Sequence, residues 1–436
     1  MSIETILLIV VILSGFALMT ARKLSQEIAV PLVAFIAIIL AGPDEGLRSL
    51  EGGVKEFARV GLLFTAVAIP AHMLQESNLF NLLGTRIGAM IGSLNLRFKT
   101  DIVLLVSFIS VFATYIMAAL FHNVTSILVN SYVIYVLAKA YKLPAVFILS
   151  AALIASNLGG FSTKWGDTPN IVEAQVWGLK HVDFFREILP VNIVLVFILA
   201  FVAYFLTKRM VGNNNDVSRI KLAHSMIKFK TEGRFMSVDS RLVFYGILSL
   251  VIAITGPLFF QSYEIPLSAF AIIVALVGTP NNHRTQSLYA LGIETYFTLI
   301  SLFVLAQVFG HSNIGIFKYI EGFLQTNTNS IYPVLIVSYL GTLTTGAASW
   351  AAAVSPSIFQ LFPSHLGAWA LGSGIAAGSS SLITAASAGV ILAHQTSTFE
   401  KDSRVDFTTY IRFGIPFSLF MLLVYAIILP LYMKLF

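Results

Sequence analysis

The chain has 436 residues, of which 57% are apolar and only 11% are charged, and its mean hydropathy is +0.85. Soluble domains carry about a quarter charged residues, so this composition excludes an ordinary soluble protein and indicates a membrane protein with many spans. The net charge of +6 requires no nucleic-acid partner, because Lys and Arg gather beside apolar segments, and the absence of Cys excludes disulfides and cysteine-ligated metals.

The first half, residues 1–211, is predicted to form one structural repeat. A membrane-spanning helix needs about 20 apolar residues. The amino-terminal stretch lacks the basic start and cleavage site of a signal peptide, so we expect it to be the first span. The predicted elements are spans at 4–21, 28–42 and 57–75 with an acidic outer loop at 43–56, a surface arm at 75–99, a re-entrant hairpin at about 102–138, a broken helix at about 144–176, and a span at 188–206.

A basic linker is predicted at 212–241, between the two halves. Residues 208–241 hold eight Lys or Arg against three acids. Basic loops stay on the cytoplasmic side of a membrane, so the linker is predicted to be cytoplasmic and both termini to lie outside. We expect a multi-pass protein of the cell membrane, which in a prokaryote is the inner membrane.

The second half, residues 242–436, repeats the order of the first. The predicted elements are spans at 242–260, 266–279 and 295–311, a surface arm at 313–325, a hairpin at about 331–362, a broken helix at about 367–395 and a last span at 413–433. Asn123 precedes Gly159 by 36 residues, and Thr342 precedes Gly378 by 36 residues. With an odd number of full crossings per half, the sequence predicts an all-α polytopic protein made of two inverted repeats. This architecture is typical of secondary transporters.

The stretch Ser156–Asn170 carries the strongest indication of a site. It continues an apolar run, yet it contains Gly159, Gly160, Gly166 and Pro169 among charged and polar side chains. Irregular polar backbone at membrane depth is tolerated only where protein buries it or where it lines a cavity. A helix broken there exposes N–H groups at one end and C=O groups at the other, so it can hold ions. The alternative is a kink that only packs.

Charged and polar side chains near this break are the candidate ligands. A carboxylate within the membrane is costly and usually functional, so Asp167 is the main candidate for binding a cation or exchanging a proton. Lys164 either pairs with Asp167 to fix the loop or faces an anionic substrate, and His122 is a second candidate for proton coupling. Asn123 and Thr125 at the hairpin tip are ligands or loop caps. The second half offers only hydroxyls, as Na⁺ ligands or helix-packing groups: Thr342, Thr344, Thr345, Ser379, Ser380, Ser381 and Thr384.

Two motifs resemble the ion transporter superfamily. They are Asn123-Val124-Thr125 and the break that runs from Ser156-Asn157-Leu158-Gly159-Gly160 to Gly166-Asp167-Thr168-Pro169-Asn170. The likeness is to the branch of arsenical-pump permeases, NhaD-like sodium/proton antiporters and the melanosomal P protein, which is related to divalent anion–sodium symporters. It implies a scaffold domain that dimerises and an elevator-like movement of the site. The resemblance places the first half-site on Asn123, Thr125, Asn157, Gly159, Ser162, Gly166, Asp167, Pro169 and Asn170, with Na⁺ expected at Asn123, Asn157 and Asp167.

The sequence departs from this superfamily in two places. His122 stands where many relatives have an acid, and the second break lacks a Pro-Asn or Ala-Asn pair. The enzyme motifs G-x-S-x-G, H-E-x-x-H and G-x-x-x-x-G-K are also missing, so we predict no catalytic residue and no cofactor except bound Na⁺. The expected partners are lipids, a small ion or anion, and a second copy of the chain.

Three functions follow from this reading. The first is a secondary transporter that exchanges Na⁺ or another small cation for H⁺. The second is a proton- or sodium-coupled carrier of a carboxylate or oxyanion, held by Lys164 and helix N-termini. The third is an accessory subunit without transport, suggested by the uncharged second half-site.

Overall fold

The computed structural model describes residues 3–20, 23–24, 26–164, 166–211, 227, 230–231, 233–259, 264–280, 293–310, 316–328 and 330–432. Within these residues every regular element is helical, which confirms the all-α fold class. In the described part of the chain, three helical stretches are long and apolar enough to cross a membrane, at Ile102–Leu120, His181–Val211 and Lys401–Leu431, and seven shorter apolar helices accompany them. Residues 212–226 of the predicted linker lie outside the described ranges.

The first half contains a helix that is longer than the sequence predicts. Its elements are α1 (Ile3–Thr20), α2 (Gln26–Ala41), α3 (Pro43–Glu76), α4 (Leu79–Phe98), α5 (Ile102–Phe121), α6 (Asn123–Ala140), α7 (Val146–Phe161), α8 (Thr168–Trp177), α9 (His181–Asp183), the π-helical η1 (Phe184–Ile188) and α10 (Leu189–Val211). The prediction of a loop at 43–56 is wrong, because α3 runs through it. Pro43 at the helix start and Asp44 and Glu45 in the first turn favour a helix N-terminus there.

The second half follows the predicted order. Its elements are α12 (Ser240–Phe259), α13 (Glu264–Gly278), α15 (Ile293–Gly310), α16 (Ile316–Gln325), α17 (Tyr332–Thr345), α18 (Ala347–Leu361), α19 (His365–Ser379), α20 (Ser387–Thr396), the 3-10 turn η3 (Lys401–Ser403) and α21 (Phe407–Tyr432). The predicted arm at 313–325 corresponds to α16, and residues 313–315 of it are outside the described part of the chain.

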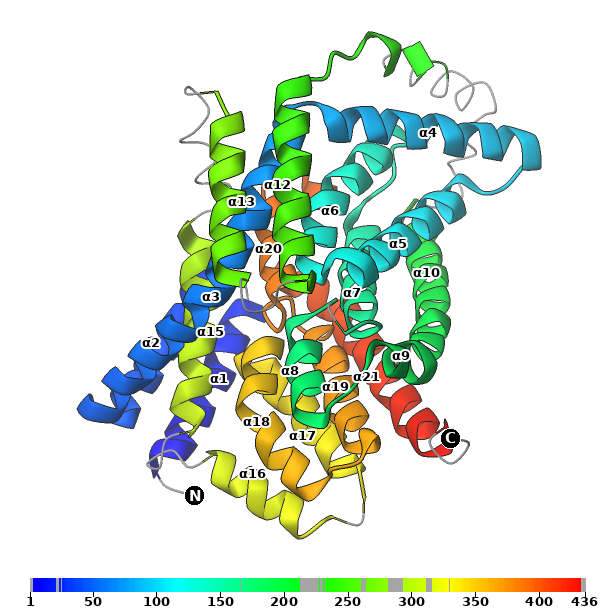
Figure 1. The fold of residues 1–436 in the computed structure, drawn as a ribbon. Helices are drawn as coiled ribbons and strands as arrows, with labels where there is room; N and C mark the ends of the chain where they lie inside the picture. Colours follow the sequence, from blue (N-terminus) through cyan, green and yellow to red (C-terminus); the bar gives the residue numbers. More distant parts are fainter. Residues whose placement is uncertain are drawn as a thin grey trace.

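The helices pack in two groups. Helices α1, α2, α3, α12, α13 and α15 contact mainly one another, and we call them the scaffold group. The hairpins α5–α6 and α17–α18, the broken helices α7–α8 and α19–α20, and α10 and α21 form the core group (Figure 1). The amino-terminal helices of each predicted repeat therefore belong to the scaffold group, and the carboxy-terminal helices of each repeat belong to the core group.

The two amphipathic arms lie across opposite ends of the molecule. Helix α4 crosses the end at which α12 begins, and α16 lies at the other end, beside α17 and α18 (Figure 1). An inverted duplication requires this placement, and the duplication itself stays a prediction.

Helices α7 and α19 form the centre of the core group. Nearly every residue of both is buried. Their small residues allow close helix approach: a side chain at Gly159 would collide with the carbonyl oxygen of Tyr115 on α5, and a Cβ at Gly378 would lie 2.7 Å from the carbonyl oxygen of Tyr339 on α17. Each broken helix is thus held directly against its own hairpin.

Candidate functional site

The first break separates α7, which ends at Phe161, from α8, which begins at Thr168. Asp167 caps α8, since its Oδ1 accepts the N–H of Thr168 at 2.8 Å. Asn170 closes the loop, because its Nδ2 donates to the carbonyl oxygens of Gly160 at 2.8 Å and Thr163 at 2.6 Å. The amide of Asn170 therefore fixes the shape of the break.

The tip of the first hairpin lies directly against this break. The N–H of Asn123 donates to the carbonyl oxygen of Gly166 at 2.9 Å, and its side chain lies beside the carboxylate of Asp167. A Cβ on Gly160 would lie 3.2 Å from that of Asp167 and 3.3 Å from that of Asn123. The structure thus brings the hairpin tip, both glycines and the carboxylate into one cluster.

Two side-chain oxygens in this region can still accept a hydrogen bond or bind a cation. The side-chain oxygens of Asn123 and Asn157 are buried and have no hydrogen-bond partner in the part of the chain that the structure describes. Buried polar atoms are rarely left without partners, and amide and carboxylate oxygens are the ligands that hard cations prefer. Asn123 lies beside Asp167, and Asn157 lies three residues before Gly160 on α7, so both oxygens are candidate ligands of a small cation.

The second half repeats the same backbone contact with different side chains. The N–H of Ala347, at the start of α18, donates to the carbonyl oxygen of Ala385 at 3.0 Å. The hairpin tips correspond as well, because His122 has φ 101° and Gly346 has φ 84°. The structural counterpart of Asn123 is therefore Ala347. The equal spacing of 36 residues, which pairs Asn123 with Thr342, gives the wrong correspondence.

A tyrosine–serine bond, which the sequence reading missed, recurs in both halves. Tyr115 and Ser162 hydroxyls lie 2.9 Å apart, and Ser381 donates to the Tyr339 hydroxyl at 2.9 Å. No local sequence signal identifies these bonds, because the partners of each lie more than 40 residues apart.

The predicted ligands of the second half mostly bond to backbone. Thr344 and Thr345 donate to the carbonyl oxygen of Gly341 at 2.8 and 3.1 Å, and Ser379 and Ser380 donate to that of Ala376 at 3.0 and 2.8 Å. In contrast, Thr342 and Thr384 have hydroxyl oxygens that are buried and without partner. Where Asp167 caps α8, Ala386 caps α20, so this half carries no charge at the matching position.

Asn157 joins the two breaks. Its Nδ2 donates to the carbonyl oxygen of Ser379 at 3.1 Å and to the hydroxyl of Ser380 at 3.3 Å. The side-chain oxygen of Asn157 takes part in neither bond and can bind a ligand. The candidate residues of both halves therefore form one continuous polar region at the centre of the core group.

The remaining candidates of the first half differ in their surroundings. Thr125 is buried on α6. Lys164 is half-buried and acts electrostatically on His181, and among the described ion pairs none joins Lys164 to Asp167. Trp165 lies outside the described residues.

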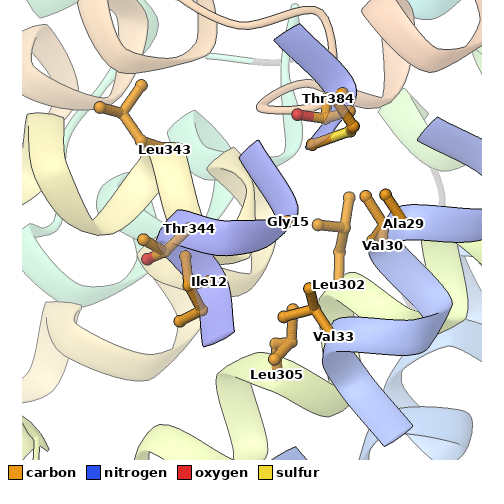
Figure 2. Close-up of a pocket in the computed structure, with 11 residues that line it drawn as sticks. Ile12, Gly15, Ala29, Val30, Val33, Leu302, Leu305, Leu343, Thr344 and Thr384 are labelled. Atoms are coloured by element: carbon orange, nitrogen blue, oxygen red, sulfur yellow. The ribbon is translucent and has the colours of Figure 1, made fainter. Parts of the chain in front are cut away.

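A small pocket of about 20 Å³ lies where the scaffold group meets the second half-site (Figure 2). Thr344 and Thr384 contribute its polar atoms. Its other walls are apolar residues of α1, α2 and α15 and of the α17 end: Ile12, Gly15, Met19, Ala29, Val30, Val33, Leu302, Leu305 and Leu343. Two predicted site residues therefore lie at the boundary between the helix groups.

Glu173 is a buried acid that the sequence reading missed. It lies on α8, its exposed fraction is 0%, and neither carboxylate oxygen has a hydrogen-bond partner. The sequence alone could have identified Glu173, because an acid within a membrane segment usually marks a functional site.

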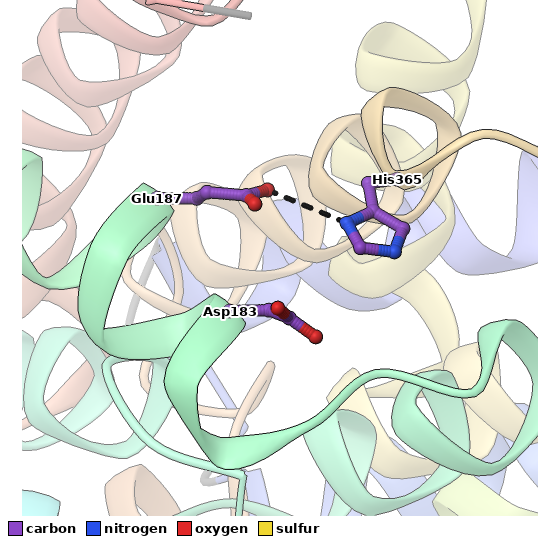
Figure 3. Close-up of side chains that lie close together, drawn as sticks. All are labelled: Asp183, Glu187 and His365. Atoms are coloured by element: carbon purple, nitrogen blue, oxygen red, sulfur yellow. Dashed lines mark ion pairs between the residues drawn. The ribbon is translucent and has the colours of Figure 1, made fainter. Parts of the chain in front are cut away.

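Asp183, Glu187 and His365 form a second titratable cluster (Figure 3). One ligand atom from each lies within 4.8 Å of the others. The carboxylate of Glu187 already accepts the indole N–H of Trp369 and lies 3.7 Å from Nδ1 of His365. Although these are ligand types that divalent cations accept, we interpret the cluster as a link between η1 and α19.

Comparison with known families identifies the chain. A family profile described as "Citrate transporter" (CitMHS) matches residues 2–389. The chain belongs to this family. The assignment establishes a membrane transporter of the ion-transporter type, and the narrower likeness to arsenical-pump permeases and NhaD-like antiporters stays a prediction.

The individual proteins that resemble this citrate transporter family member share little sequence identity with it. The magnetosome protein MamN of Magnetospirillum gryphiswaldense is 25% identical over 62% of this chain, and an uncharacterized transporter of Mycobacterium tuberculosis is 26% identical over 44%. These alignments span 64% and 43% of the relatives' own lengths. The Alcanivorax borkumensis YdaH transporter structure is 14% identical, with a TM-score of 0.43 and coverage of 91% of this chain and 90% of that one.

Proposed function

We propose that the protein is a secondary transporter that moves a small polycarboxylate of the citrate class, coupled to a cation. The observation that carries this proposal is the contact between a hairpin tip and a broken helix, where Asn123 lies against Asp167 and the buried amide oxygens of Asn123 and Asn157 have no hydrogen-bond partner among the described residues. Membership of the citrate transporter family supports a carboxylate as the transported anion.

In this proposal the cation and the anion bind next to each other at the break. The amide and carboxylate oxygens of Asn123, Asn157 and Asp167 hold the coupling cation, Na⁺. The N-terminus of α8 and the half-buried ammonium group of Lys164 attract the anion, since helix N-termini favour negative charge. A bound cation beside Asp167 reduces the repulsion between that carboxylate and the anion, so each ion strengthens binding of the other.

The protein is also a candidate for exchange of a cation for a proton. The specific observation is that two acids, Asp167 and Glu173, lie on or next to α8, whereas Lys164 is the one basic side chain of the break. Two acids against one base leave one carboxyl that Lys164 does not balance, and such a group can take up and release a proton in exchange for a cation.

We further propose that the core group moves as a unit against the scaffold group, as in an elevator mechanism, and that two copies associate through their scaffolds. The segregated helix packing supports this proposal. The start of α1 and the end of α21 lie toward the end that carries α16, and α12 begins at the end with α4 (Figure 1). This arrangement agrees with a cytoplasmic linker and outer termini in a cell membrane.

Uptake by proteoliposomes tests the function. We expect the purified full chain to accumulate radiolabelled citrate when an inward Na⁺ or H⁺ gradient is imposed. Asp167→Asn should abolish accumulation because it removes the only charge at the cation cluster, whereas Asp44→Asn, an exposed acid at the start of α3, should leave it intact.

The other outcomes decide between the alternatives. A Na⁺-driven change of internal pH without citrate uptake would favour cation/proton exchange. Unaltered transport by Asp167→Asn would refute the role given to the cluster. If neither citrate uptake nor Na⁺/H⁺ exchange is found in wild-type protein, an accessory role becomes the better interpretation.

A further inference from the structure

Glu173 occupies an unusual position between the two halves of the chain. It lies on α8, and its Oε2 would be 2.6 Å from a Cβ placed on Gly372 of α19. The ring of Phe161 at the end of α7 lies 2.5 Å from the same Cβ position. The carboxyl group is thus enclosed by an aromatic ring and a glycine backbone, and the absence of a side chain at Gly372 leaves the space that it fills.

Among the described residues, no basic group faces this carboxyl from the elements that pack around it. The packed elements α7 and α18 contain no Asp, Glu, Lys, Arg or His, and α19 contains only His365, at its far end beside Glu187. On its own helix, the charged neighbour is Asp167, which acts on Glu173 electrostatically. An ionised carboxylate buried without a partner costs several kcal/mol, whereas a neutral carboxyl costs much less.

We propose that Glu173 carries the proton of the transport cycle, a role that rests on the proposed transport function. In the arrangement seen here, the carboxyl is protonated and buried against α19. It loses its proton to water when a cation neutralises Asp167, because the repulsion between the two carboxylates then disappears. Atoms and charge balance, since one H⁺ leaves Glu173 for each positive charge that arrives at the Asp167 cluster.

The same electrostatics predict opposite effects for the two kinds of substrate. Na⁺ at the Asp167 cluster favours ionisation of Glu173 and therefore releases a proton. Citrate at the N-terminus of α8 adds negative charge near Glu173 and therefore favours the protonated form. The carboxyl of Glu173 would thus couple proton release to Na⁺ binding and proton uptake to citrate binding.

Infrared difference spectroscopy of the purified full-length protein tests this assignment without requiring transport. We expect a carbonyl-stretch band of a protonated carboxyl that decreases when NaCl is added and does not change with choline chloride. This band should be lost in Glu173→Gln and retained in Glu400→Gln, whose carboxylate is exposed and pairs with Lys139. An unchanged Na⁺-sensitive band in Glu173→Gln would overturn the proposal.

Transport measurements give a second readout. Glu173→Gln mimics the protonated form, so it should retain exchange of radiolabelled citrate for unlabelled citrate but lose accumulation driven by a pH gradient. Accumulation equal to that of wild type would contradict the proposal.

If Glu173→Gln does not fold, Gly372→Ala provides the test. The added methyl group crowds Oε2 of Glu173, so the same infrared band should shift in frequency, and an unshifted band would count against Glu173. If wild type carries no citrate, the infrared result still decides the role of Glu173, so the two proposals fail separately.

Discussion

His122 holds a backbone conformation that favours glycine. Its φ and ψ are 101° and 143°, and the matching tip of the second half is Gly346. Non-glycine residues in sparsely populated regions of positive φ cost about 1–3 kcal/mol and persist mainly at functional sites. The compensating contact is weak, because Nδ1 accepts the N–H of Val124 at 3.4 Å. This strained backbone is the observation that points to a chemical role for the imidazole.

We therefore predict that His122→Gly unfolds at the same temperature as wild type or higher, whereas His122→Ala, which keeps the strain and loses the cap, unfolds at a lower one. Thermal unfolding of the detergent-solubilised protein measures both. If His122 takes part in proton coupling, His122→Gly should also lose pH-driven uptake while remaining folded. A large loss of stability in His122→Gly would show that the contact with Val124 outweighs the strain.

Individual site residues were predictable to different degrees. Asp167 and Asn170 could be placed at the break because Gly, Pro and charge coincide within a few positions of an apolar run. Glu173 was not predicted, although its charge lies only six positions after Asp167, because it stands outside the Gly- and Pro-containing motif that marks the break. The contact between Glu173 and Gly372 joins residues far apart in the chain, which no local pattern records.

The contact between each broken helix and its hairpin is the critical packing at the level of elements. A side chain at Gly159 would collide with the backbone of Tyr115. Because backbone cannot move aside as a flexible side chain can, we predict that Gly159→Ala destabilises the protein by about 1–3 kcal/mol and separates α7 from α5.

A matched glycine controls for the effect of alanine on a helix. Gly322 on α16 has no atom within 4 Å of the added Cβ, so Gly322→Ala should be neutral or slightly stabilising. Lowered thermal stability and lowered citrate uptake in Gly159→Ala alone would support the packing argument. Equal stability of the two variants would contradict it.

The order of elements could be predicted well, but their register could not. Hydrophobic length identifies the spans, and polar interruptions identify the breaks. The second arms of the two hairpins differ in length, however: α6 has 18 residues and α18 has 15. A fixed sequence spacing therefore misaligned the tips, and only the backbone bonds from Asn123 to Gly166 and from Ala347 to Ala385 align them.

At the scale of the whole molecule, the boundary between the scaffold and core groups determines which movements are possible. The pocket shown in Figure 2 lies on this boundary, with Ile12 and Val33 on the scaffold side and Thr344 on the core side. Its apolar walls offer few hydrogen bonds that would resist sliding. A core that moves past the scaffold would change the distance between Ile12 and Thr344 while leaving that between Ile12 and Val33 unchanged.

The absence of native Cys allows this movement to be tested directly. We predict that joining Ile12→Cys to Thr344→Cys with a short bifunctional maleimide abolishes citrate uptake, because the link fixes core to scaffold. The pair Ile12→Cys and Val33→Cys places the same link within the scaffold and should leave uptake intact, as should each single variant treated with the reagent. Mass spectrometry of the intact protein confirms that the link has formed. Undiminished uptake by protein that is fully linked between Ile12→Cys and Thr344→Cys would rule out movement of the core past the scaffold at this boundary.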